Sequence, residues 1–344
     1  MQSKFNSVVL FGGNGFIGSH FAAHLIEKEL ADNIYIADIE PASPDLWPKP
    51  LTRKFAEGKV TYVRLDVREK ITSESLPKQT DLIVNLAAVH REPGHEKSEY
   101  FATNIPGAEN VCEWAKQINC DRIIFTSTIA VYGATEERAT MREDSLTMPL
   151  TPYGVSKLTA EKIHIAWQKS NLAHKLLIVR PGVIFGPNEK GNVSRMVKAI
   201  LGRYFFFTSN QGVRKAGGYV KELCESILFM MDYQDSKNEP TVLYNFTMDP
   251  APSVQDFAKT IAKVGGVKRN PLNVPLWFLL LGSQFFHIGY KLLKKPSSIN
   301  PTRIRKLLRY NDIEPTVLRK LGYKYKYSLE DGLSDWRKNR PDEW

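Results

Sequence analysis

The sequence predicts an α/β fold with a doubly wound parallel sheet, because short apolar runs alternate with helical patterns along its first half. The apolar runs are typical of buried strands and lie at residues 7–11, 33–37, 60–65, 81–86, 122–126 and 175–179. Helical patterns lie between them at residues 16–29, near 104–117 and at 153–170. Strands separated by helices pair in parallel through right-handed crossovers, which leaves helices on both faces of the sheet.

A glycine-rich segment, Gly12-Gly13-Asn14-Gly15-Phe16-Ile17-Gly18, joins the first predicted strand to the first predicted helix. Its spacing satisfies both GxGxxG and GxxGxxG. Glycines allow a tight turn and a close approach to a pyrophosphate, and the helix N-terminus offers it free N–H groups. The segment therefore predicts a dinucleotide site whose cofactor contacts are Gly12, Gly15, Phe16, Ile17 and Gly18.

Residues at the ends of the next three strands agree with such a site. Asp38 ends the second strand, 20 residues beyond Gly18, where a carboxylate binds both adenosine ribose hydroxyls and repels a 2′-phosphate. NAD is therefore the predicted cofactor. Asp66 and Val67 follow the third strand and are expected to hold the adenine edge. The cofactor can lie against the sheet where the fourth strand ends in small residues, Leu86, Ala87 and Ala88.

The composition agrees with one large globular domain and a smaller lobe. The chain has 344 residues, of which 42% are hydrophobic and 24% charged, so it can bury a core without disulfides or metals. Its three cysteines show no metal-type spacing. The regular pattern fades near residue 181. We therefore expect an NAD-binding domain over residues 1–180 and, over 181–344, mostly a substrate-binding lobe with segments that return to the main domain.

Three residues form a candidate catalytic set. Tyr153 and Lys157 are four residues apart on a predicted helix, so their side chains share a face. An ammonium group beside a phenol stabilises the phenolate and lowers the pKa of the tyrosine toward neutrality. Thr128 follows the fifth strand at the carboxyl edge of the sheet, where its hydroxyl can bridge a substrate oxygen and Tyr153.

Taken in order along the chain, these motifs resemble the extended short-chain dehydrogenases of the NAD-dependent epimerase/dehydratase group. The resemblance covers about residues 5–335 and also rests on Asn104 and on Arg180-Pro181-Gly182-Val183-Ile184-Phe185-Gly186-Pro187. It implies a Rossmann-type fold with Asn104 and Arg180 among the cofactor contacts. It further implies that Tyr153 is the acid/base, that Lys157 is its partner and that Thr128 is the hydroxyl helper.

A narrower resemblance concerns the substrate. Residues 86–91, 180–187 with 191–193, and the tail from 301 to 323 are similar to epimerases and reductases of bacterial O-antigen and capsule clusters. Some of that group act on N-acetylhexosamine linked to polyprenyl diphosphate. Arg91 and Asn192, with Thr128, are the expected substrate contacts. A solvated surface role is the simpler interpretation of four further candidate phosphate contacts, which are His90, Arg203, Arg214 and Lys215.

The sequence departs from the family pattern at three places. Ile129 and Ala130 stand where 4,6-dehydratases carry Asp-Glu, so no carboxylate pair is available there to eliminate water. Val183 stands where many nucleotide-sugar epimerases carry an Asn that contacts the sugar diphosphate. The usual Tyr-Val-x-Asp motif reads Tyr219-Val220-Lys221-Glu222. The first departure argues against a dehydratase, and the second puts a standard nucleotide-sugar grip in doubt.

The net charge of +10 lies in the last quarter of the chain. Residues 1–262 carry 30 Lys and Arg against 30 Asp and Glu, whereas residues 263–344 carry 17 against 7. A basic segment attracts phosphates or anionic lipid. Residues 275–295 are too short and interrupted to span a bilayer, but they form a basic amphipathic helical pattern. The pattern predicts either peripheral membrane contact or a lobe helix that packs on the core or at a dimer contact.

Together these features predict an NAD-dependent sugar 4-epimerase. Its substrate would be a diphosphate-linked N-acetylhexosamine, nucleotide- or polyprenyl-linked, used in surface polysaccharide biosynthesis. Three alternatives remain: an NAD(P)H-dependent 4-keto-sugar reductase, a sterol-type 3-hydroxy dehydrogenase, and a dinucleotide-sensing module without turnover. We expect a cytoplasmic homodimer, either free or peripheral at the inner face of the membrane. Nucleic-acid binding is not expected, because the basic tail lacks any recognition motif.

Overall fold

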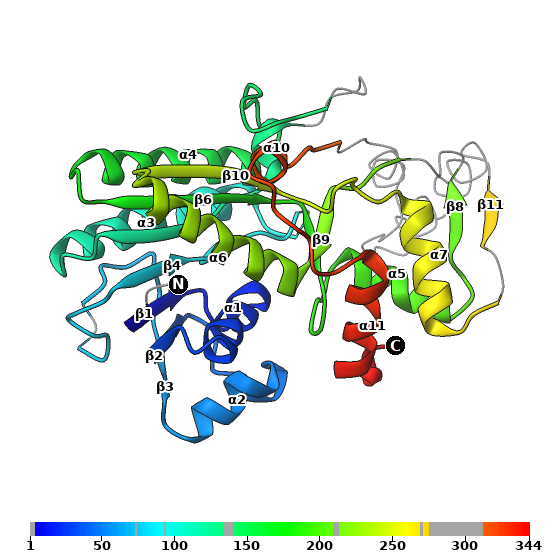
Figure 1. Ribbon diagram of the computed structural model, residues 1–344, viewed down its shortest axis with the longest axis horizontal. Helices are drawn as coiled ribbons and strands as arrows, with labels where there is room; N and C mark the ends of the chain where they lie inside the picture. The colour runs from blue at the N-terminus through cyan, green and yellow to red at the C-terminus, as the bar shows by residue number, and fades with distance from the viewer. Residues whose placement is uncertain are drawn as a thin grey trace, which may run out of the picture.

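The core of the protein is a seven-stranded sheet in the order β10-β6-β5-β4-β1-β2-β3, with every pair of strands parallel. The computed structural model (Figure 1) describes residues 4–72, 74–92, 94–133, 140–208, 213–268, 271–274 and 312–344. The sheet confirms the predicted doubly wound architecture. Its strand order reverses between β1 and β4, and in such sheets ligands bind at that point, beyond the carboxyl ends of the strands. The strands are β1 (Phe5–Phe11), β2 (Ala31–Asp38), β3 (Val60–Arg64), β4 (Leu82–Asn85), β5 (Arg122–Thr126), β6 (Lys175–Pro181) and β10 (Thr241–Phe246).

Each face of the sheet buries its own hydrophobic cluster, because successive side chains of a strand point to opposite faces. Val8 and Leu10 of β1 pack with α1 (Phe16–Glu27), α2 (Lys49–Ala56) and α6 (Val220–Lys237). Val9 and Phe11 pack on the other side with α3 (Lys97–Gln117) and α4 (Pro152–Lys169). All four of these β1 side chains are fully buried. The strands therefore consist of consecutive apolar residues.

Two helix starts that matter for the site have local causes. At the start of α3, the Glu99 side chain accepts a hydrogen bond from the Glu96 N–H at 2.8 Å. The helix begins at Lys97, seven residues before the helical pattern seen in the sequence. At the start of α4, Thr151 Oγ1 accepts from the Gly154 N–H at 3.1 Å, and Pro152 occupies the first turn. Both arrangements satisfy N–H groups that a helix leaves open.

In the part of the chain where a substrate lobe is predicted, short elements lie outside the large sheet. Two small parallel pairs join β7 (Val183–Phe185) to β9 (Gly217–Tyr219) and β8 (Phe206–Thr208) to β11 (Leu272–Val274). Among the described residues the helices of the predicted lobe are α5 (Asn192–Leu201), α7 (Val254–Gly265) and α11 (Leu329–Asn339), whereas α10 (Thr316–Lys320) packs against β10. In Figure 1 α11 lies beside α5 and α7, away from the strands of the large sheet. Between α5 and α7 the chain returns to the large sheet, because β10 is one of its strands and α6 packs on one of its faces.

A buried and a half-buried carboxylate attach the C-terminal segment, residues 312–344, to the rest of the protein. Glu222 of α6 is fully buried and accepts hydrogen bonds from the N–H groups of Lys326 at 2.8 Å and Tyr327 at 2.7 Å, and from the Tyr323 hydroxyl. Glu143 similarly accepts from the Val317 N–H at 3.2 Å. The glutamate that departs from the Tyr-Val-x-Asp motif therefore secures the C-terminal segment.

Candidate active site

The glycine segment forms a tight loop between β1 and α1. Gly12 has φ +75°, and a Cβ there would lie 2.7 Å from the Ala87 nitrogen. A Cβ on Gly18 would lie 2.6 Å from the Gly12 oxygen. These two positions therefore need glycine so that the loop can pack against the end of β4 and the start of α1.

Gly15 differs, because its Cβ would meet only the Gly12 oxygen at 3.2 Å. It is the N-cap residue of α1, and no described side chain caps this helix start. Because residue 15 is glycine, no side chain at this position covers the N–H groups of the first turn. Such a cradle fits a pyrophosphate, so Gly15, Phe16 and Ile17 are suited to hold NAD there.

Asp38 lies beside the glycine loop at the end of β2. Its carboxylate accepts hydrogen bonds from the N–H groups of Asn14 and Glu40, both at 3.1 Å. Burial raises the pKa of Asp38, and these hydrogen bonds act in the opposite direction. The carboxylate is thus fixed next to the diphosphate cradle, where the adenosine ribose of a dinucleotide would lie.

The segments after β3 and β4 are held by side chains of α3. Val67 is buried, and its carbonyl accepts from Asn110 Nδ2 at 2.9 Å. Asp66 lies nearer the surface and pairs with Arg68, which lowers the pKa of the carboxyl. The adenine contacts predicted for Asp66 and Val67 remain predictions.

Asn104 fixes the chain beyond residues 86–88. Its Oδ1 accepts from the Val89 N–H at 2.8 Å, and its Nδ2 donates to the Val89 carbonyl at 3.1 Å and to Ser156 Oγ at 2.9 Å. Asn104 therefore links the loop after β4 to α4. Leu86, Ala87 and Ala88 are half-buried in this loop, whereas His90 and Arg91 are exposed just beyond it.

Tyr153, Lys157 and Thr128 come together where β5 ends against α4. The Thr128 hydroxyl pairs with Tyr153, and its Oγ1 also accepts from the Ala130 N–H at 3.2 Å. Lys157 is buried, with its Nζ 4.1 Å from the centre of the Phe125 ring. A phenol, an ammonium and a hydroxyl at the carboxyl edge of the sheet can together move a proton to and from a bound alcohol.

The pKa values of this set differ in part from expectation. Burial raises the pKa of Tyr153 to about 12, and the hydrogen bond with Thr128 opposes that rise. The structure therefore does not show the expected lowering of the Tyr153 pKa toward neutrality, because loss of solvent outweighs the hydrogen bond with Thr128. Burial lowers the pKa of Lys157 to about 7, and the Glu161 carboxylate opposes that change.

Arg180 has partners inside the protein. It is 5% exposed at the end of β6, and its Nε and Nη2 donate to the two carboxylate oxygens of Glu161 at 2.9 and 2.7 Å. Its Nη1 donates to the Tyr132 hydroxyl at 2.8 Å. The cofactor contact predicted for Arg180 remains a prediction. The sequence analysis missed Glu161 as the ion-pair partner of Arg180. The spacing of four residues between Lys157 and Glu161 was the available signal.

The other predicted phosphate and substrate contacts lie in the lobe. Asn192 is exposed at the start of α5, where its Oδ1 accepts from Arg195 Nη2 at 2.6 Å. Arg203 and Arg214 are exposed, and burial lowers the pKa of the half-buried Lys215 to about 8. Val183 lies in β7, where its N–H donates to the Ala216 carbonyl at 2.8 Å.

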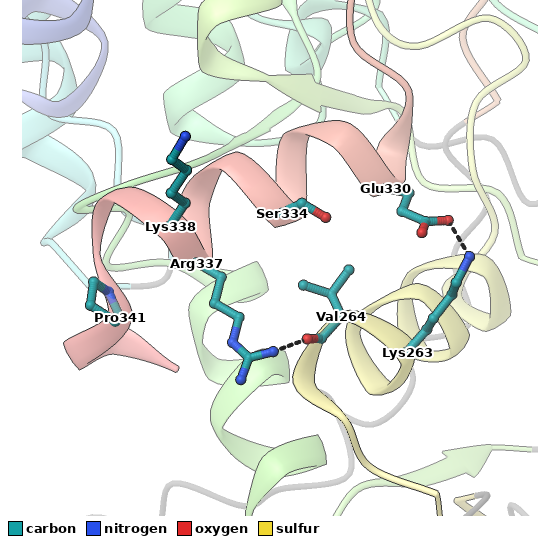
Figure 2. Close-up of a pocket in the computed structure, with 7 residues that line it drawn as sticks. All are labelled: Lys263, Val264, Glu330, Ser334, Arg337, Lys338 and Pro341. Atoms are coloured by element: carbon teal, nitrogen blue, oxygen red, sulfur yellow. Dashed lines mark hydrogen bonds and ion pairs between the residues drawn. The ribbon is translucent and has the colours of Figure 1, made fainter.

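A separate open depression lies between α7 and α11 (Figure 2). Lys263 and Glu330 pair across it at 2.7 Å, and Arg337 donates to the Val264 carbonyl. None of its lining residues belongs to the predicted site.

In the described part of the chain no helix is long and apolar enough to cross a bilayer, and no cluster of metal-ligating side chains occurs. The amphipathic segment 275–295 lies outside the described residues.

A glycine loop suited to a dinucleotide lies at the same carboxyl edge of the sheet as the half-buried Tyr153 and the buried Lys157. Such an edge is suited to redox chemistry on a hydroxyl group, so fold and site define a dinucleotide-dependent oxidoreductase. The chain belongs to the NAD dependent epimerase/dehydratase family, whose model matches residues 8–245. The predicted family, enzyme class and cofactor are thereby confirmed.

Similar proteins cover nearly the whole chain. An N-acetyl-alpha-D-glucosaminyl-diphospho-ditrans,octacis-undecaprenol 4-epimerase of Escherichia coli O157:H7 is 27% identical over 329 residues, which are 95% of this chain and 93% of that protein. Among solved structures, the UDP-N-acetylglucosamine 4-epimerase of Methanobrevibacter ruminantium M1 has a TM-score of 0.74 at 18% identity, covering 99% and 100% of the two chains. The UDP-glucuronic acid 4-epimerase of Bacillus cereus, solved with NAD, has a TM-score of 0.74 at 20% identity, covering 98% and 99%.

Proposed function

We propose that this protein is an NAD-dependent 4-epimerase of an N-acetylhexosamine carried on a diphosphate, with polyprenyl diphosphate as the favoured carrier. The observation that carries the proposal is that Tyr153, Lys157 and Thr128 lie at the same carboxyl edge of the sheet as the glycine loop, with the Thr128 hydroxyl paired to Tyr153. The undecaprenol-linked epimerase, which matches nearly full length, supports the choice of substrate. A role in surface polysaccharide biosynthesis follows from such a substrate.

In the proposed mechanism, Tyr153 exchanges the proton of the sugar 4-hydroxyl. The Tyr153 phenolate removes that proton, and the phenol returns it after the sugar has turned over in the pocket. Thr128 donates a hydrogen bond to the same sugar oxygen, and the Lys157 ammonium stabilises the phenolate. NAD, when bound by Gly15, Phe16, Ile17 and Asp38, supplies the reversible hydride acceptor at C4.

Ile129 and Ala130 follow Thr128 directly, so the chain offers no carboxylate at those positions for removing water from the sugar. This supports an epimerase over a dehydratase. The competing 4-keto-sugar reductase would use the same three side chains, but it would consume a reduced cofactor at every turnover. Cofactor balance therefore separates the two reactions.

The experiment that tests the proposal compares two donors, UDP-linked and polyprenyl-diphosphate-linked N-acetylhexosamine. We expect the 4-epimer to form without a net change in NADH absorbance, with faster turnover of the polyprenyl donor. Faster turnover of the UDP donor would overturn the choice of carrier. Turnover only with stoichiometric NAD(P)H would overturn the epimerase in favour of the reductase.

A substrate on a lipid carrier would lie at a membrane, so contact of the protein with a membrane can be tested directly. We propose peripheral contact through residues 275–295 and the basic tail, and a homodimer as the working unit. We expect the protein to float with vesicles containing anionic lipid and to migrate as a dimer in analytical ultracentrifugation. Failure to float would overturn the proposed membrane contact, and migration as a monomer would overturn the proposed dimer. Neither result would affect the catalytic assignment.

A further inference from the structure

A buried ion pair lies directly behind the catalytic set. Glu161 and Arg180 are 2% and 5% exposed, and the guanidinium binds both carboxylate oxygens, at 2.9 and 2.7 Å. The Ser127 hydroxyl also donates to Glu161 Oε1. Removing two charges from water is costly, so a pair of this kind needs close geometry and further hydrogen bonds to persist. Here both oxygens of the Glu161 carboxylate accept hydrogen bonds.

The pair is also fixed from its far side. Arg180 Nη1 donates to the Tyr132 hydroxyl at 2.8 Å, and that hydroxyl donates to Asn245 Oδ1 at 2.8 Å. The network therefore runs from α4 across the ends of β5 and β6 to β10. It fixes the direction in which Glu161 presents its charge, because neither the guanidinium nor the carboxylate can turn without losing several hydrogen bonds.

Glu161 lies one helical turn beyond Lys157 on α4, so the two side chains share a face. Its other neighbours connect it to the same site, since Ser127 immediately precedes Thr128. Lys157 itself sits over the Phe125 ring, against which the His164 ring stacks at 4.1 Å between centres. The ammonium is thus buried against an aromatic ring, where a nearby negative charge acts strongly.

The remaining titratable groups around Lys157 do not supply that negative charge. His164 Nδ1 donates to the Ala160 carbonyl, and Asn85 Nδ2 donates to His164 Nε2 at 3.2 Å, which describes a neutral ring. Burial accordingly lowers the pKa of His164 to about 4. Loss of solvent around the ring lowers the pKa of His90, which lies after β4, and repulsion by Arg91 and Lys157 lowers it further. Among the described residues, Glu161 is the group whose charge favours the ammonium form.

We propose that Glu161, held in place by Arg180 and Ser127, is a positioning residue that keeps the Lys157 side chain protonated and aligned behind Tyr153. This inference rests on the role proposed for Lys157. Arg180 balances the charge of Glu161, so that one net positive charge remains at Lys157. Without the carboxylate, two cations would share one buried site.

The test measures the protonation of Lys157 without any turnover. The protein is labelled with carbon-13 at the lysine ε position, its Lys157 resonance is assigned from a Lys157→Met sample, and the resonance is titrated by NMR. We expect Glu161→Gln to lower the titration midpoint by about 1–3 pH units, the range typical for loss of an opposite charge in a protein. Glu161→Asp keeps the charge and should recover most of that shift.

A second variant keeps the test valid if Glu161→Gln fails to fold with Arg180 unpaired. Glu161→Gln/Arg180→Gln removes both charges, and neutral replacement of a buried pair is often tolerated. Its midpoint should also fall, by less than in Glu161→Gln, because Arg180 no longer repels the ammonium. Glu222→Gln is the matched control, since it removes a buried carboxylate from the C-terminal attachment and should leave the Lys157 midpoint unchanged.

The kcat–pH profile provides the catalytic readout once an epimerase substrate is in hand. Loss of the ammonium at lower pH should move the alkaline limb of kcat to lower pH in Glu161→Gln, and Glu161→Asp should restore it. A Lys157 midpoint that is unchanged in Glu161→Gln and in the double variant would overturn the inference. Because the NMR titration needs no substrate, that result is distinguishable from failure of the proposed epimerase activity.

Discussion

Two buried glutamates, Glu161 of α4 and Glu222 of α6, are used in different ways. Glu161 is paired with a cation and lies one turn from Lys157, at the carboxyl edge of the sheet. Glu222 accepts the N–H groups of Lys326 and Tyr327 and holds the C-terminal segment. The comparison shows that burial of a carboxylate alone does not mark function. The groups it faces decide whether it serves the reaction or the attachment of the chain.

The largest effect should come from the catalytic edge itself. Tyr153→Phe removes the hydroxyl that exchanges a proton with the sugar, so kcat should fall by about 10²- to 10⁴-fold, the usual contribution of a general acid–base group. Epimer formation followed by chromatography measures this. Tyr204→Phe is the control, because Tyr204 is 64% exposed and should leave kcat unchanged. Full activity of Tyr153→Phe would mean that the edge does not carry the chemistry.

The cofactor side of the same edge should respond next. Asp38→Asn keeps the shape of the side chain but removes the charge that favours NAD over NADP. We expect NAD affinity to fall about 10- to 100-fold, as for the loss of a hydrogen bond to a charged group, and discrimination against NADP to weaken. Fluorescence titration with each dinucleotide measures both. The matched control is Asp32→Asn on the same strand, which removes the exposed pair with Lys4. An unchanged preference for NAD in Asp38→Asn would contradict the assignment.

The pH dependence of the wild-type protein should report Lys157. Its pKa is about 7, below the value near 10.4 of a free lysine, because burial disfavours the ammonium. The charged form is present below this pKa and is lost as the pH rises through it. We therefore expect kcat to fall on the alkaline side with a midpoint well below 10.4. A profile that stays flat up to the range of free lysine would show that Lys157 has no part in the rate.

The smallest effect should come from the C-terminal attachment. Glu222→Gln replaces one accepting oxygen by an NH₂ group that faces backbone N–H groups, so the free energy of unfolding should fall by about 1–3 kcal/mol. Thermal denaturation measures the loss, and kcat below the transition should be unchanged. Glu330→Gln removes an exposed pair with Lys263 and should change stability by less than about 0.5 kcal/mol. A large loss of kcat in Glu222→Gln would contradict the claim that Glu222 serves only the attachment of the C-terminal segment.

The sequence was informative where parallel strands control the geometry. Their carboxyl ends share one edge, so the order of Gly12–Gly18, Asp38, Thr128 and Tyr153 along the chain was enough to predict that they lie along that edge. Glu161 was missed because its spacing from Lys157 is common on helices and its partner Arg180 comes from a different strand. Glu222 looked like a departure from a motif, because its partners lie about 100 residues away. Long-range polar contacts of this kind leave no local pattern in the sequence.

The most direct test of the central claim is the fate of a deuterium label placed at C4 of the polyprenyl-diphosphate-linked N-acetylhexosamine. Oxidation and reduction at one edge, without release of the reduced cofactor, predict that the 4-epimer retains the deuterium and that no NADH accumulates. Mass spectrometry of the product, with absorbance recorded in parallel, measures both. An epimer that has lost its deuterium, or a requirement for added NAD(P)H in each turnover, would contradict the claim that this protein is an epimerase with a recycled cofactor.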